Sequence, residues 1–118
     1  MRVLAFEDSY DILALLESSG VDCRGLTFQQ HWNSSNCLMK VKDFEPDILM
    51  LDFYMPPYNG LQVLTALLEA VSAGTIRRPK TIVAMSSEPS ANQTLLDAGA
   101  DLEAIKFEIG RLLVWESQ

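Results

Sequence analysis

Short apolar runs alternate with longer amphipathic stretches along this sequence. Continuous apolar runs of four or five residues are typical of strands that are buried on both faces of a sheet. Such patterns predict strands over residues 3–6, 21–28, 48–51, 81–85 and 102–105. Apolar residues at helical spacing between these runs predict helices that begin after Ser9, after Ser34 or Ser35, and over residues 61–73, 90–98 and 107–115. The chain is therefore predicted to alternate strand and helix throughout.

This alternation defines the fold class. Strands joined by single helices pair in parallel through right-handed crossovers, which place helices on both faces of the sheet. The prediction is an α/β fold, a doubly wound five-stranded parallel sheet, over residues 1–118 as one domain. A chain of 118 residues is long enough to bury a core without disulfides or structural metals. Cys23 and Cys37 lack metal-ligand spacing and are expected to be reduced thiols.

The charge and hydrophobicity of the chain exclude some classes of binding partner. With 16 acidic against 9 basic residues the net charge is −7, which disfavours nucleic acid and anionic membranes. The one basic cluster, at Arg77, Arg78 and Lys80, is expected in a surface loop. The N-terminus lacks a signal-peptide core, and no apolar run approaches the ~20 residues of a membrane span, so we expect a cytoplasmic protein.

Polar side chains follow four of the predicted strands. Glu7 and Asp8 come after the first, Asp52 after the third, Ser86 at the end of the fourth and Lys106 after the fifth. The carboxyl ends of parallel strands meet at one edge of a sheet, where ligands bind. Three carboxylates gathered there repel one another unless a cation lies between them, and oxygen ligands suit Mg²⁺.

In this order and spacing, these residues resemble the receiver domain of two-component response regulators. The resemblance rests on the acidic pair at 7–8, on DFYMPPYNG with Asp52 eight residues before Gly60, on Ser86, and on Gly99-Ala100-Asp101 followed by Lys106. It implies a flavodoxin-like fold with strand order 2-1-3-4-5, numbered along the chain. It also implies Mg²⁺ held by Asp8, Asp52, the main-chain carbonyl of Tyr54 and, through water, Glu7.

The resemblance also implies a function. Asp52 would accept a phosphoryl group from a sensor histidine kinase or a phosphotransfer protein, while Lys106 and Ser86 would contact the phosphoryl oxygens. Phosphorylation would change the conformation of a surface that binds an unknown downstream protein. Whether the chain forms a homodimer is left open. We expect a single domain without an output domain, and no enzymatic activity beyond its own phosphorylation and dephosphorylation.

Each site residue also has an ordinary structural interpretation. Asp52 could cap the following loop, Asp8 could cap the first helix, Glu7 and Lys106 could be solvated surface charges, and Ser87 competes with Ser86. His31, the only histidine, is expected at the surface and not as a ligand.

The sequence departs from the receiver pattern at two positions. Phe107 follows the lysine where the family usually has proline, and Glu103 replaces the usual aromatic residue three positions before it. Tyr54 and Glu88 stand where side chains influence how water reaches an aspartyl phosphate. A bulky ring at Tyr54 predicts a long-lived phosphoryl state.

Three other functions were weighed. A phosphorylation-independent, receiver-like interaction module is the main alternative, because Glu103 and Phe107 depart from the pattern. An aspartate-nucleophile phosphatase would need a second acid at Tyr54. A flavin carrier would need a phosphate-binding loop where Glu7 and Asp8 stand, and these acids would repel a phosphate.

Overall fold

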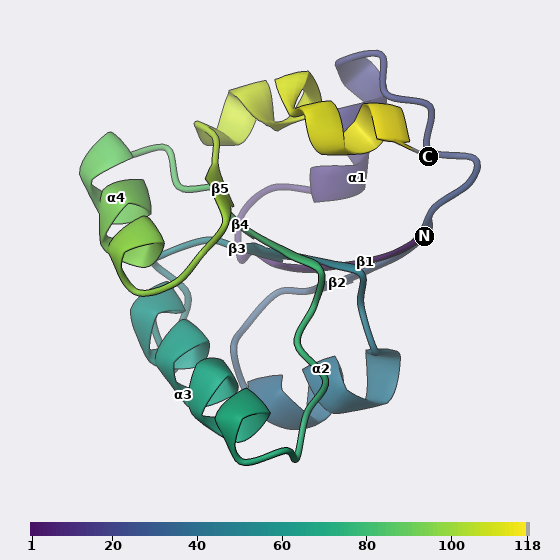
Figure 1. Cartoon of the computed structure of the whole chain (residues 1–118). Helices are drawn as coiled ribbons and strands as arrows, with labels where there is room; N and C mark the ends of the chain where they lie inside the picture. The colour runs from purple at the N-terminus through teal and green to yellow at the C-terminus, as the bar shows by residue number, and fades with distance from the viewer. Residues whose placement is uncertain (118) are drawn as a thin grey trace.

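Five parallel strands form the central sheet of this computed structural model, which describes residues 1–117 (Figure 1). The strands are β1 (Arg2–Phe6), β2 (Thr27–His31), β3 (Ile48–Leu51), β4 (Thr81–Ala84) and β5 (Leu102–Glu103). Their order in the sheet is β2-β1-β3-β4-β5. The doubly wound α/β fold and the strand order 2-1-3-4-5 are confirmed.

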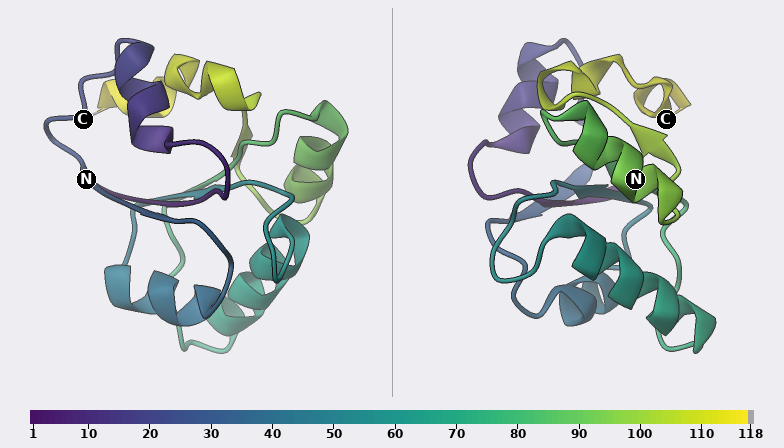
Figure 2. Two further views of the ribbon diagram at one scale, coloured as in Figure 1. Left: turned by 180° about the vertical axis from the view of Figure 1, so that it is seen from behind. Right: turned by 90° about the vertical axis from the view of Figure 1, so that its left-hand side faces the viewer.

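Helices cover both faces of the sheet (Figure 2). They are α1 (Ile12–Ser18), α2 (Cys37–Phe44), α3 (Gly60–Ser72), α4 (Pro89–Asp97) and two 3₁₀ helices, η1 (Lys106–Arg111) and η2 (Leu113–Ser117). The helices α2 and α3 lie on one face, and α1 lies with η1 and η2 on the other. No helix within residues 1–117 has both the length and the apolar character needed to cross a bilayer.

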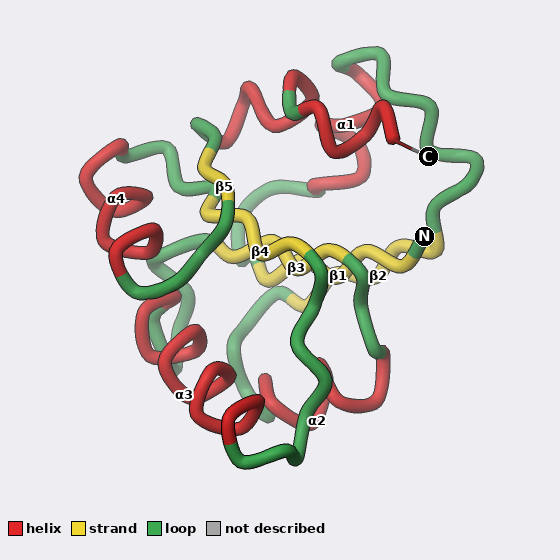
Figure 3. Tube along the Cα trace, in the orientation of Figure 1, coloured by secondary structure: helices red, strands yellow, loops and turns green. Residues whose placement is uncertain are grey.

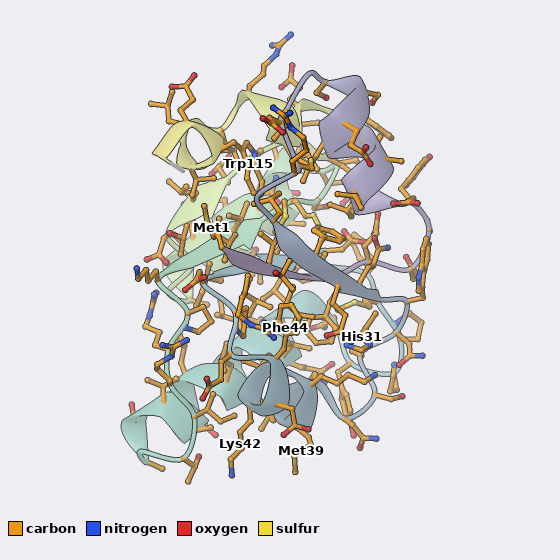
Figure 4. The ribbon with its side chains drawn as sticks, turned by 90° about the vertical axis from the view of Figure 1, so that its right-hand side faces the viewer. Met1, His31, Met39, Lys42, Phe44 and Trp115 are labelled. Carbon is orange, nitrogen blue, oxygen red and sulfur yellow. The ribbon has the colours of Figure 1, made fainter. Side chains whose placement is uncertain are left out.

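Alternate residues of the buried strands point to opposite faces and build two cores. In β1, Leu4 and Phe6 join the core beneath α2 and α3, whereas Val3 and Ala5 join the core beneath α1. Figure 4 shows the two sides, with Phe44 of α2 on one and Trp115 of η2 on the other. Because both faces are buried, β1 and β3 are almost wholly apolar. The first polar side chain after each strand lies at the edge of the sheet where the carboxyl ends of the strands meet.

The predicted second strand was wrong in its position. The strand lies at Thr27–His31 and not at 21–28. Val21 and Leu26 instead belong to a loop whose apolar side chains pack against the α1-side core. The strand itself is polar because β2 is an edge strand and its side chains are only partly buried. The apolar residues at 21–28 therefore indicated a loop with buried side chains and not a strand over that range.

The predicted last helix was also wrong, because residues 106–117 form two 3₁₀ helices and no α-helix. Gly110 lowers helix propensity in the middle of this segment. A Cβ atom at Gly110 would collide with the side chain of Ser19, at the end of α1. The glycine therefore serves close packing of η1 on α1.

Two predicted helix caps were wrong as well. The N-cap of α1 is Asp11, whose carboxylate accepts a hydrogen bond from Ala14 N, and not Ser9. The helix α2 begins after Asn36, and neither Ser34 nor Ser35 caps it.

The turn from β3 into α3 fixes the direction of the chain after Asp52. Asn59 and Gln62 form a reciprocal capping box at the start of α3. Gly60 lies so close to the Asp52 carbonyl oxygen that a Cβ atom there would collide with it. Figure 3 shows the loops that leave the strands and lead into the helices. Those loops carry the predicted site residues other than Lys106, which begins η1.

Candidate functional site

Three carboxylates converge where β1 and β3 end. Glu7 and Asp8 follow the last residue of β1, and Asp52 follows the last residue of β3. One carboxylate oxygen from each lies within 4.8 Å of the others. These strands are neighbours in the sheet, with Phe6 paired to Leu51, so the three acids meet at one edge. The structure thus brings together the acids that the sequence singled out.

Lys106 places its ammonium group between two of these acids. Its Nζ lies 2.9 Å from Glu7 Oε2 and 3.4 Å from Asp52 Oδ2. The contact with Glu7 is the shorter of the two, and nothing in the sequence indicated it. Three carboxylates and one ammonium leave a charge of −2 when all are ionised. Neither Glu7 nor Lys106 is a solvated surface charge, because both side chains are buried.

Glu7 is the most deeply buried acid, with 0% of its surface exposed. Burial, followed by the neighbouring Asp52, raises its pKa from 4.5 to about 7, although Lys106 opposes the increase. Apart from the ion pair with Lys106, neither of its carboxylate oxygens has a hydrogen-bond partner within the described part of the chain. For Lys106, burial would lower the pKa, but the contacts with Glu7 and Asp52 outweigh burial and raise it.

Neither Asp8 nor Asp52 caps a helix, although Asp52 accepts one hydrogen bond from the loop that follows it. Asp11 caps α1, and Asn59 caps α3. The Asp8 side chain is exposed and accepts a hydrogen bond from Ser9 Oγ at 3.0 Å. Asp52 is buried, and its Oδ1 accepts a hydrogen bond from Phe53 N at 2.8 Å.

Ser86 and Tyr54 lie on the loops beside this cluster. The buried Ser86 follows β4, and its Oγ accepts a hydrogen bond from Glu88 N at 3.1 Å. The exposed Tyr54 donates its hydroxyl to Glu88 Oε2 at 3.0 Å, which links the loop after β3 to the loop after β4. The contribution of the Tyr54 carbonyl to a metal site stays a prediction, as do the roles of Ser86 and Lys106 toward a phosphoryl group.

Comparisons with known proteins show which chains this one is similar to. No protein-family model matches the chain. The transcriptional regulatory protein PrrA of Mycobacterium leprae is 30% identical over 105 residues, which cover 89% of this chain and 43% of that protein. The chain spans less than half the length of the curated relatives that it matches.

Two solved structures share the fold over almost all of the chain. The receiver domain of the histidine kinase CKI1 from Arabidopsis thaliana, complexed with Mg²⁺, superimposes with a TM-score of 0.73 at 16% identity, covering 98% of this chain and 90% of that one. A CheY-like response regulator receiver domain protein from Methanospirillum hungatei gives a TM-score of 0.67 at 18% identity, covering 98% and 89%. This chain has the fold of a response-regulator receiver domain.

Sequence reasoning missed three side chains that hold the loops around this site. Gln30 of β2 contacts the loop after β1, Ser34 contacts the loop after β3, and Asn92 of α4 contacts the loop after β4. Each is a polar residue whose oxygen or nitrogen atoms bind main-chain groups. One signal was available for Asn92, which is a polar residue at a core-facing helix position next to Ala91 and three residues before Leu95. Nothing in the sequence distinguished Gln30 from Gln29.

Two aromatic rings pack against each other beside Lys106. Tyr10 and Phe107 meet edge to face, with 5.1 Å between ring centroids. Lys106 Nζ lies 5.4 Å from the centre of the Tyr10 ring, within range of a cation–π contact. Phe107, the departure from the family's proline, therefore takes part in an aromatic pair beside the site.

Proposed function

We propose that this chain is a Mg²⁺-dependent phosphoacceptor in two-component signalling, with Asp52 as the phosphorylated residue. The observation that carries the proposal is the cluster of Glu7, Asp8 and Asp52 beside Lys106, at the carboxyl edge of a parallel sheet. Its receiver fold and its partial likeness to a transcriptional regulator support the same function.

The donor set fits a hard divalent cation. Carboxylate oxygens without histidine or cysteine are the ligands that Mg²⁺ prefers. Asp8 is exposed and Asp52 is buried, so the cluster reaches from solvent to the sheet edge. Asp8 and Asp52 would bind the ion directly, with the Tyr54 carbonyl as a third ligand and Glu7 acting through water. The bound ion would offset the negative charge of the transferring phosphoryl oxygens.

The reaction would transfer one phosphoryl group. A carboxylate oxygen of Asp52 would form a bond to phosphorus as the phosphorus–nitrogen bond of a phosphohistidine breaks. The electron pair of that bond leaves with the imidazole of the donor, and the product is an acyl phosphate. Lys106, already 3.4 Å from Asp52, would keep a positive charge beside the new phosphoryl oxygens.

Ser86 would report the modification to the rest of the domain. Its hydroxyl is held at the end of β4, where it would donate a hydrogen bond to a phosphoryl oxygen. That bond exists only after phosphorylation, so it would shift the population of the following loop and of α4. A histidine kinase or phosphotransfer protein would supply the phosphoryl group in the cytoplasm, and a downstream protein would bind the altered surface.

The direct test is incubation with Mg²⁺ and a small-molecule phosphodonor, followed by intact-protein mass spectrometry. The wild-type chain is expected to gain one phosphoryl group, and Asp52→Asn is expected to gain none. EDTA should suppress the gain in the wild type. A wild-type chain that stays unmodified while another receiver domain is labelled in parallel would favour the phosphorylation-independent interaction module.

A further inference from the structure

Gln30 of β2 makes hydrogen bonds with both halves of its amide group. Its Nε2 donates to the carbonyl oxygens of Glu7, at 3.1 Å, and Tyr10, at 2.8 Å. Its Oε1 accepts a hydrogen bond from Ile12 N, at 2.9 Å. The amide therefore uses two donors and one acceptor on three main-chain groups of a single loop.

These bonds enclose Asp8. Glu7 and Tyr10 are the residues on either side of the Asp8–Ser9 dipeptide, and Ile12 begins α1. Glu7 N also donates to the His31 carbonyl, so the main chain at Glu7 is fixed to β2 through both its amide and its carbonyl group. Gln30 extends that attachment from the end of β1 to the first turn of α1.

The position of the Asp8 carboxylate depends on this loop. Asp8 is exposed, and its side chain accepts a hydrogen bond from the adjacent Ser9, which belongs to the same loop. The loop must nevertheless hold that carboxylate within 4.8 Å of oxygens of Glu7 and Asp52 against their mutual repulsion. Lys106 contacts Glu7 and Asp52 but not Asp8 among the ion pairs of the described residues, so a fixed main chain is needed to oppose the repulsion at Asp8.

We propose that Gln30 is a positioning residue for the metal site, which acts through the main chain of residues 7–12 to hold Asp8 toward Asp52. The inference rests on the proposed function, because it assigns Gln30 to the cation site of the phosphoacceptor. Gln30 touches neither cation nor phosphoryl group. Groups one step removed from metal ligands commonly change metal affinity about 10- to 100-fold when they are replaced.

The neighbouring residue supplies a matched control. Gln29 is the same residue type on the same strand, but its side chain points to the opposite side of β2 and is exposed. Methionine has nearly the volume of glutamine and lacks its amide, so Gln30→Met removes the three hydrogen bonds while filling the space. Gln29→Met makes the same chemical change without touching the loop.

The experiment measures cation affinity without phosphorylation. Mn²⁺, which shares the preference of Mg²⁺ for oxygen ligands, is titrated against each protein and followed by the electron paramagnetic resonance signal of the free ion, with Mg²⁺ as competitor. Gln30→Met is expected to weaken Mn²⁺ binding about tenfold or more. Gln29→Met is expected to match the wild type, and thermal unfolding of all three proteins in EDTA records any change in stability.

The outcomes separate the inference from the proposed function. Equal Mn²⁺ affinity in Gln30→Met and the wild type, with or without a lower melting temperature, would overturn the positioning role and leave the phosphoacceptor proposal standing. Failure of the wild type to bind Mn²⁺, or undiminished binding by Asp8→Asn, would overturn the metal site itself. If Gln30→Met does not fold, Gln30→Glu replaces it, and tighter Mn²⁺ binding by that variant would equally refute the role.

Discussion

The raised pKa of Glu7 predicts that the metal-free protein loses stability as the pH increases through neutrality. Burial is the main cause of the increase from 4.5 to about 7, and Asp52 adds to it. The folded protein therefore binds more protons than the unfolded chain between these two pH values. Stability from this group is fully present below pH 4.5 and is lost as the pH rises through about 7.

The size of the effect follows from the change in pKa. An increase from 4.5 to about 7 is worth about 3 kcal/mol, at roughly 1.4 kcal/mol for each pKa unit. Most of this falls between pH 5 and pH 8, so the free energy of unfolding should decrease by about 2 to 3 kcal/mol across that range. That is a large share of the stability of an ordinary domain.

His31 acts in the opposite direction in the same pH range. Burial, aided by Lys40, lowers the pKa of its imidazole from 6.5. A lowered histidine pKa makes the folded state gain stability as the pH rises, which would hide part of the Glu7 effect. The free energy of unfolding should therefore also be measured as a function of pH in a His31→Gln variant, which lacks the opposing contribution of His31.

Urea denaturation in EDTA between pH 5 and pH 8, followed by tryptophan fluorescence, provides the assay. The buried Trp115 is a suitable reporter. The wild type should lose stability with increasing pH, Glu7→Gln should lose much less, and saturating Mg²⁺ should reduce the loss because a cation favours ionised carboxylates. A wild-type free energy of unfolding that stays level or rises with pH in the His31→Gln background would refute the reasoning.

Two further predictions concern the loops around the site. Tyr54→Ala should speed loss of the phosphoryl group from Asp52 by about tenfold, or about 1.4 kcal/mol of barrier, because the ring limits the approach of water. Tyr54→Phe keeps the ring and loses only the hydrogen bond to Glu88, so its rate of phosphoryl loss should match that of the wild type. Equal rates for Tyr54→Ala and the wild type would contradict this role of the ring. Asn92→Ala should destabilise the protein by about 1 to 3 kcal/mol in urea denaturation, because its amide binds the main chain of Ser86 and Ala104 in the interior. Replacement of the exposed Gln93 by alanine is the matched control, and an equally small loss in both variants would contradict the prediction.

The parts of the fold that the sequence predicted well are those buried on both faces. After the first residue of β1 and of β4, the strands β1, β3 and β4 are wholly apolar, and the first polar residue after each apolar run marks the carboxyl edge of the sheet. Because the site lies at that edge, the same pattern located Glu7 and Asp52. The end of each apolar run therefore predicted both where the strand ends and where the site lies.

The errors arose where an element lies at an edge or covers only one side of the sheet. The strand β2 is polar, and its predicted position was taken from apolar loop residues such as Val21 that pack on the core. The 3₁₀ helices after Lys106 cover the α1 side, and their apolar residues have helical spacing although the backbone is not α-helical. In both places the pattern recorded which side chains are buried but not the conformation that buries them.

The site of this domain depends on residues outside the recognisable motif. The loop with Glu7 and Asp8 is held by Gln30, the loop after Asp52 by Ser34, and the loop with Ser86 by Asn92. Gln30 lies 23 residues after Glu7, Ser34 lies 21 residues before Met55, and Asn92 lies 6 residues after Ser86, so the local sequence around the motif does not identify them. The motif residues specify the chemistry of the cluster. The side chains of Gln30, Ser34 and Asn92 hold the loops on which most of those residues lie. A chain that kept Glu7, Asp8, Asp52, Ser86 and Lys106 but lost these three contacts is therefore expected to carry the same functional side chains on loops that are held less firmly.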